Sequence, residues 1–156
     1  MFIKYTLIKN FRKVRRKMKY VSLIHALNLP CRLQTCGDWH CSALQWKNPH
    51  ILETKDSILG EYGIERNKNI PEHTEKYNVA NHIRALLDLL YVGNFTVAQG
   101  MNREYICNSI YDQEVFRQVI KFKNLSHWNE IDSFMTKEYL KKWVNFKKGV
   151  FADENI

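Results

Sequence analysis

The densest group of chemically competent side chains lies in residues 31–41, with the sequence Cys-Arg-Leu-Gln-Thr-Cys-Gly-Asp-Trp-His-Cys. Thiolate sulfur and imidazole nitrogen are the ligands that zinc prefers in proteins. We therefore predict Cys36, His40 and Cys41 of this segment as metal ligands, with His73 further along the chain. Asp38 and Cys31 are further candidate ligands in the segment. No Cys-x-x-Cys pair occurs in the sequence. Ordinary reduced thiols are consequently the alternative interpretation.

The same segment offers a pair of groups for acid–base catalysis. Asp38 and His40 lie two residues apart, and residues at this spacing share one face of an extended chain. With His73 or His82, they predict a metal-dependent hydrolase or nuclease site, with zinc or another divalent metal as the cofactor. The alternative is an ordinary surface turn, because Asp beside Gly37 is common turn chemistry.

A helix expected over residues 76–92 would present further polar side chains to this segment. We predict His82 and Arg84 as catalytic residues that form one wall of a cleft, opposite Asp38 and His40. The alternative makes His82 a hydrogen-bonded residue at the border of the apolar face. Arg84 and Asp88 would then be an i, i+4 pair on the surface, where such a contact stabilises a helix only slightly.

A cysteine nucleophile is a further hypothesis. Cys36, Cys41 or Cys107 could pair with a histidine elsewhere in the chain. The spacing selects no one pair, and a lone cysteine is more often a small buried apolar residue. The sequence therefore gives this hypothesis little support.

The first half of the chain carries strand patterns. An apolar segment over residues 20–27 predicts a strand, a short strand is predicted over 42–46, and residues 57–66 read as a strand interrupted by glycines. The second half carries helical apolar periodicity, which predicts helices over the ranges 76–92, 112–123 and 127–147. Strands followed by helices predict an α+β fold.

The ends of the predicted helices carry local signals. Gly93 is expected to end the first helix, and Asp112 and Ser126 are expected to cap the next two. The aromatic side chains of residues 127–147 fall in one stripe, which predicts core packing rather than a surface for stacking bases. Residues 95–108 are predicted to form a hairpin or a loop.

The positive charge is concentrated at the N-terminus. The net charge is +8 over 156 residues, and residues 1–17 hold seven basic residues and no acidic one, so the other 139 residues are nearly neutral. The tail is predicted either to bind nucleic-acid backbone without sequence preference or to be idle. A further interpretation places the true start at Met18. Residues 18–150 are predicted to be one globular domain, and residues 151–156 a frayed tail.

Composition and missing motifs narrow the function. Apolar residues make up 45% of the chain, enough for a core, and no apolar run is long enough to span a bilayer. The predicted location is the cytoplasm. The sequence lacks the glycine-rich phosphate-binding motifs, His-Glu-x-x-His and Gly-x-Ser-x-Gly.

We therefore interpret the chain first as an interaction or regulatory domain with a protein partner. Its Lys-, Asn- and Ile-rich composition suggests a microbial partner protein of a mobile-element, toxin–antitoxin or defence system. A metal-dependent hydrolase and a nucleic-acid binder are the alternatives.

Overall fold

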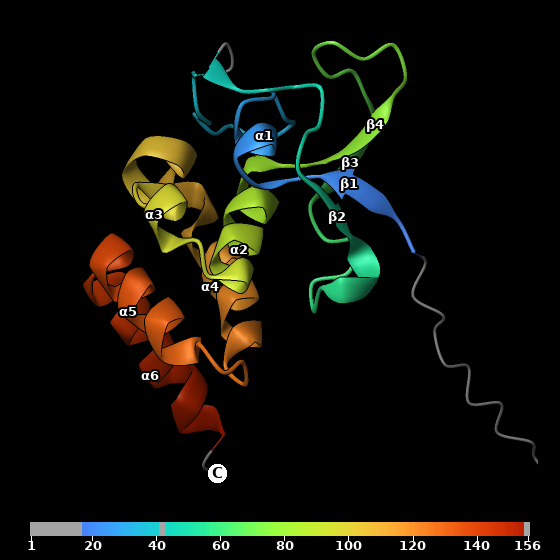
Figure 1. Cartoon of the computed structure of the whole chain (residues 1–156). Helices are drawn as coiled ribbons and strands as arrows, with labels where there is room; N and C mark the ends of the chain where they lie inside the picture. Colours follow the sequence, from blue (N-terminus) through green and yellow to red (C-terminus); the bar gives the residue numbers. More distant parts are fainter. Residues whose placement is uncertain (1–16, 41–42, 155–156) are drawn as a thin grey trace, which may run out of the picture.

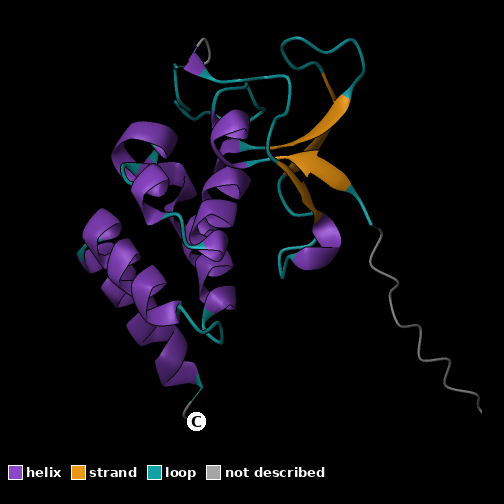
Figure 2. Ribbon diagram, viewed as in Figure 1, coloured by secondary structure: helices purple, strands orange, loops and turns teal. Residues whose placement is uncertain are grey.

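The structure is a computed structural model that describes residues 17–40 and 43–154. Most of the basic N-terminal tail therefore lies outside the described residues, as does the predicted ligand Cys41. The described chain forms a small α+β domain, as the sequence predicts. Figure 1 shows α2 at the centre, between the sheet and the helices of the second half of the chain, and Figure 2 separates the strands from the helices by colour.

The first half of the chain forms a four-stranded mixed sheet with the order β2-β1-β4-β3. Its strands are β1 (Lys19–Val21), β2 (Ile51–Glu53), β3 (Ile64–Lys68) and β4 (Tyr77–Ala80). Strand β1 runs antiparallel to β2, with Tyr20 opposite Leu52, and parallel to β4, with Val21 opposite Val79. Strand β3 pairs antiparallel with β4.

Three strand predictions need correction. The segment 20–27 is divided into β1 and the helix α1 (Leu23–Leu27), because Leu23 adopts φ 57° and turns the chain. Residues 57–63 form turns, with a short 3-10 helix η2 (Thr54–Asp56) before them, and the strand begins only at Ile64. Residues 43–46 form no strand; Trp46 is buried in the core instead.

Helix α2 (His82–Val92) is the central element, and each of its residues from 82 to 90 is buried. The predicted helix began six residues too early, because residues 77–80 pair with both β1 and β3 as a strand. Asn81 caps the helix by accepting a hydrogen bond from the backbone N–H of Arg84. Gly93, at φ 80°, ends the helix as predicted.

Helices and helical turns fill the second half. They are α3 (Phe95–Ala98), the π-helix η3 (Met101–Ile106), the 3-10 turn η4 (Ser109–Tyr111), α4 (Asp112–Val119), the 3-10 turn η5 (Ile120–Phe122), α5 (Trp128–Tyr139) and α6 (Lys141–Asp153). The hairpin alternative for residues 95–108 is therefore wrong. The predicted helix 112–123 is confirmed as α4 and η5.

The predicted helix 127–147 is two helices. The chain breaks at Leu140, which adopts φ 56°, and α6 then continues through residues 151–153 of the predicted frayed tail. Neither predicted N-cap has that role. Asp112 lies inside α4 and accepts a hydrogen bond from Lys142 Nζ at 2.9 Å, and the N-cap position of α5 is His127.

The aromatic stripe packs into the core, as predicted. Trp143 is fully buried, and its indole N–H donates to Asp132 Oδ1 at 2.8 Å. Phe116 contacts it edge to face. No helix within the described ranges has the length and apolar composition that crossing a bilayer requires.

Candidate functional site

A pocket of about 400 Å³ opens beside the loop that follows α1. We call it the Cys31 pocket. Most of its surface is apolar, and polar side chains of the loop and of α2 interrupt it. It is lined by Leu27, Asn28, Leu29, Pro30, Cys31, Leu33, Thr35, Cys36, Asp38, Trp39 and His82. Trp39 lies at the rim with 85% of its surface exposed.

The loop closes tightly over the N-terminus of α2. Gly37 adopts φ 68°, and a Cβ atom added there would lie 2.6 Å from His82 Cε1 and 2.8 Å from the carbonyl oxygen of Leu27. Only glycine fits this position, because it combines a left-handed backbone with a contact at its van der Waals limit. The Gly37 N–H donates to the carbonyl of Tyr105 at 2.8 Å, which fixes the loop against η3.

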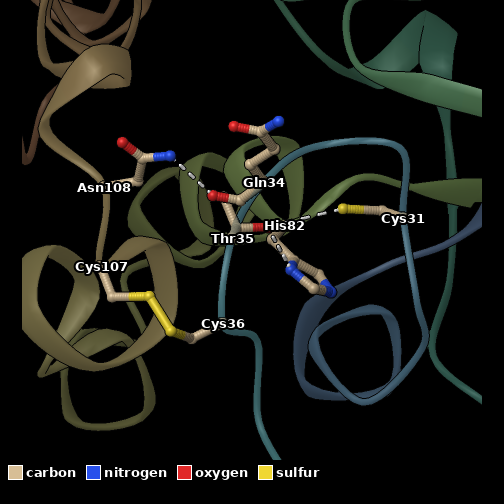
Figure 3. Close-up of a disulfide and its surroundings, with 7 residues drawn as sticks. All are labelled: Cys31, Gln34, Thr35, Cys36, His82, Cys107 and Asn108. Atoms are coloured by element: carbon tan, nitrogen blue, oxygen red, sulfur yellow. Dashed lines mark hydrogen bonds between the residues drawn. A yellow bond between two sulfur atoms is a disulfide. The ribbon is translucent and has the colours of Figure 1, made fainter.

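Three side chains of the pocket form a chain of hydrogen bonds (Figure 3). His82 Nε2 lies 2.7 Å from the carbonyl oxygen of Leu29. A carbonyl only accepts, so Nε2 carries the proton and Nδ1 of the neutral ring is free to accept. Thr35 Oγ1 lies 2.7 Å from Nδ1, and Cys31 Sγ lies 3.7 Å from Thr35 Oγ1. The arrangement connects a thiol to an imidazole through a hydroxyl.

This arrangement shifts the acidity of both end groups. Burial raises the pKa of the Cys31 thiol, but the hydrogen bond and charge of His82 lower it more, so the net pKa lies below its ordinary value. Burial lowers the pKa of His82, and its interaction with Cys31 raises it more. A proton on His82 and a thiolate at Cys31 therefore stabilise each other.

A disulfide between Cys36 and Cys107 lies at the edge of the same pocket. Its Cα atoms are 6.0 Å apart, and both cysteines are exposed. The expectation of reduced thiols is therefore wrong for these two residues. Because Cys36 Sγ is bonded to Cys107 Sγ, it cannot coordinate a metal as a thiolate.

The predicted acid–base pair is present at the pocket. His40 Nδ1 lies 2.6 Å from Asp38 Oδ1, and Asn28 Nδ2 donates to the other oxygen of Asp38 at 3.2 Å. The His40 side chain is 81% exposed, and Asp38 lines the pocket. The structure thus brings Asp38 and His82 to the same pocket and leaves His40 on its outer side.

His73 lies elsewhere, in the connection between β3 and β4. Its Nε2 lies 2.8 Å from the carbonyl oxygen of Trp46, and its Nδ1 lies 3.0 Å from the hydroxyl of Tyr77. Over residues 17–40 and 43–154, no three His, Cys, Asp or Glu side chains are grouped as a metal site would require. The metal set of Cys36, His40 and His73 is not brought together, and Cys41 lies outside the described residues.

Arg84 is not part of the pocket wall. Its guanidinium is fully buried and donates to Asp88 Oδ1 at 2.9 Å, to the carbonyl of Gly60 at 2.8 Å and to the hydroxyl of Tyr20 at 2.8 Å. Asp88 also accepts from the hydroxyls of Ser22 and Tyr20. The predicted surface pair is therefore wrong, since both partners lie in the core. We call these four side chains the buried network: Tyr20, Ser22, Arg84 and Asp88.

Sequence reasoning missed the parts of the site that spacing does not reveal. Thr35 has no signal of its own in the sequence. The nucleophile hypothesis names Cys36, Cys41 and Cys107, whereas the structure places Cys31 in the hydrogen-bonded chain to His82. Trp39, which stands exposed at the rim of the pocket, has no signal that distinguishes it from a core tryptophan.

The fold and the pocket define a small α+β domain whose pocket is lined by a half-buried thiol and by one cysteine of an exposed disulfide. Comparison of the chain with protein-family models, with curated proteins and with solved structures gives no match.

Proposed function

We propose that this chain is a regulatory interaction domain that takes an apolar side chain of a partner protein into the Cys31 pocket. The observation that carries the proposal is Trp39, a large aromatic residue held in the open at the rim of an apolar pocket. Exposed tryptophan next to a concave apolar surface is typical of binding sites.

The pocket supports this function by its size and lining. About 400 Å³ lies within the usual range for ligand sites and admits one large side chain. Leu27, Leu29 and Leu33 supply apolar contacts. An occupant that fills the pocket and also covers Trp39 has to extend along the surface, and an extended segment of a partner protein has that shape.

Selection from a displayed library of seven-residue peptides tests the proposal. The bait is the purified protein kept free of reductant, and binding is measured by fluorescence anisotropy of a labelled peptide. We expect enriched peptides to carry a bulky apolar residue and to bind Trp39→Ala at least about tenfold more weakly, because truncation of a central aromatic residue commonly costs 2 kcal/mol or more.

Ile58→Ala is the matched control, because Ile58 is also an exposed apolar residue (42%) but lies outside the pocket lining. Binding to this variant should equal that of the wild type. Failure to enrich any peptide, or equal binding by Trp39→Ala and the wild type, would contradict the proposal.

The hydrogen bond between His40 and Asp38 supports a second candidate, an acid–base role for His40 in hydrolysis. The carboxylate orients the ring by accepting from Nδ1, so Nε2 is left to take a proton from water or substrate. The test is hydrolysis of a panel of esters and phosphodiesters, with and without divalent metal. Activity abolished in His40→Ala supports this role, and activity that is absent or unchanged rejects it.

Nucleic-acid binding through residues 1–17 stays a prediction, since all but Lys17 lie outside the described residues. It predicts that binding falls steeply with salt and disappears when residues 1–17 are deleted.

A further inference from the structure

The disulfide between Cys36 and Cys107 joins the wall of the Cys31 pocket to a distant part of the chain (Figure 3). Residues 33–39 supply much of the pocket lining, namely Leu33, Thr35, Cys36, Asp38 and Trp39. Over this stretch the backbone is neither helix nor strand. Cys107 follows η3 and lies 71 residues further along the chain. The bond is therefore a covalent link between the loop that shapes the pocket and the helical half of the domain.

Two of the hydrogen bonds beside this link are exposed to water. Gln34 N–H donates to the Tyr111 hydroxyl at 2.9 Å, and Asn108 Nδ2 donates to the Gln34 carbonyl at 2.9 Å. Such bonds replace bonds to water at a small net gain. A third, from the N–H of the buried Gly37 to the carbonyl of Tyr105, measures 2.8 Å. Without the disulfide, noncovalent contacts of this kind would have to hold the loop against η3 and η4.

The disulfide is open to attack in the folded protein. Both Cys36 and Cys107 are exposed, and exposed or strained disulfides are the ones that are commonly labile and regulatory. Cys107 also adopts φ 45°, a left-handed conformation that is unfavourable for a residue with a Cβ atom. Cleavage of the bond would allow this residue to relax, so both its exposure and its backbone favour reduction.

We propose that the disulfide between Cys36 and Cys107 is a site of reversible reduction by dithiols, and that its redox state decides whether the Cys31 pocket keeps its shape. One thiolate of the dithiol forms a bond to one of the two cysteine sulfurs, and the electron pair of the broken bond leaves with the other. The second thiol of the reagent then displaces the first cysteine from the mixed disulfide. The dithiol is oxidised to a disulfide, and its two protons end on Cys36 and Cys107.

Reduction changes how the pocket meets a partner. In the oxidised protein, the loop of residues 33–39 is fixed before binding, and Trp39 stands at the pocket rim. In the reduced protein, a partner has to order the loop as it binds, and this ordering lowers the affinity. The control of partner affinity rests on the proposed function, whereas the reduction and the release of the loop do not.

Dithiothreitol, a small dithiol, is the probe that tests the proposal on the full chain. The folded protein is treated with it in the absence of denaturant, and iodoacetamide labelling with mass spectrometry counts the thiols before and after. Nuclear magnetic resonance relaxation of the nitrogen-15-labelled protein then gives a backbone order parameter for each residue. Circular dichroism checks that the reduced protein keeps its secondary structure.

We expect Cys36 and Cys107 to become alkylated after treatment of the folded protein. Order parameters of residues 33–38 should fall from about 0.85, the value of a rigid backbone, to below about 0.6, while those of residues 82–90 in α2 stay high. The affinity for a peptide selected on the oxidised protein should fall about tenfold.

The matched control is Cys36→Ser/Cys107→Ser, which lacks the bond under all conditions. Its loop should be mobile and its peptide affinity low both with and without dithiothreitol. A response of this variant to the dithiol would place the reactive group elsewhere and overturn the proposal.

A disulfide that is reduced only after denaturation would overturn the proposal. So would a reduced, folded protein in which residues 33–38 stay rigid, or loss of the whole fold on reduction. A released loop with unchanged peptide affinity would overturn the control of binding. The relaxation measurement uses no peptide, so failure to select any peptide would contradict the proposed function alone.

Discussion

Two polar clusters begin on the same helix and have opposite surroundings. The buried network contains Arg84 and Asp88 from one side of α2, and nearly every polar atom of this ion pair has a partner inside the protein. The Cys31 pocket contains His82 from the first turn of α2, and its thiol faces an open space. We infer that the network stabilises the fold, whereas the pocket is free to bind and react.

The difference arises from which side of the helix each residue occupies. Arg84 and Asp88 lie one turn apart on the side that faces β1 and the turns that precede β3, and a charge buried there must be paired. His82 points to another side, toward the loop of residues 28–38, where the Cys31 pocket opens. The following experiments separate stability from reactivity along this division.

The largest expected effect is on the buried network. Arg84→Met should lower the free energy of unfolding by about 3–5 kcal/mol, because it leaves the carboxylate of Asp88 buried without its cation. The double variant Arg84→Met/Asp88→Leu should recover a large part of this loss. Urea unfolding followed by circular dichroism measures both. A loss below about 1 kcal/mol in the single variant would remove the distinction between the two clusters.

The disulfide is expected to have the next largest effect. Removing it in Cys36→Ser/Cys107→Ser should lower the free energy of unfolding by about 2–4 kcal/mol, because the bond closes a long loop in the unfolded chain. Adding a reductant should destabilise the wild type by a similar amount and leave the double variant unchanged. Equal sensitivity of the two proteins to reductant would show that the bond does not form.

His82 should have a smaller effect on stability than Arg84. In His82→Ala, the carbonyl of Leu29 and the hydroxyl of Thr35 lose their partner, which typically costs about 1–3 kcal/mol. His40→Ala is the matched control, because its side chain is exposed and should change stability by less than about 0.5 kcal/mol. Unfolding curves that place His40→Ala below His82→Ala would contradict the assignment of His82 to the interior wall.

The smallest effect is a shift in a pH profile. The thiol of Cys31 has a lowered pKa, so its thiolate should persist to lower pH than that of an ordinary cysteine. The rate of Cys31 alkylation in Cys36→Ser/Cys41→Ser/Cys107→Ser should rise with pH at a midpoint below the usual value. Adding His82→Ala should move that midpoint upward. An unchanged midpoint would show that His82 does not act on the thiol.

The fold class could be predicted from the sequence, because periodicity records which side chains meet the core. The end of α2 at Gly93 and the burial of the aromatic stripe of α5 and α6 were predicted correctly, because both depend on local sequence patterns. The start of α2 was not, since the pairing of residues 77–80 with β1 depends on a strand more than fifty residues away. The break between α5 and α6 at Leu140 could not be predicted, because no glycine or proline marks this position in the sequence.

The site was predicted only in part, for a related reason. Asp38, His40 and His82 were identified as polar residues of the right kind, and two of them line the pocket. Arg84 was assigned to the same wall because it is close in sequence, but two residues along a helix rotate a side chain by more than half a turn. The pairing of Cys36 with Cys107 depends on tertiary contact, which spacing does not record.

The central claim is that the Cys31 pocket serves binding while the buried network serves stability, and Trp39→Ala tests it most directly. One preparation is used for two measurements: the free energy of unfolding and the affinity for a peptide selected on the wild type. The account predicts a change in stability within about 0.5 kcal/mol and a loss of affinity of about tenfold or more. Full affinity in a stable Trp39→Ala protein would contradict it.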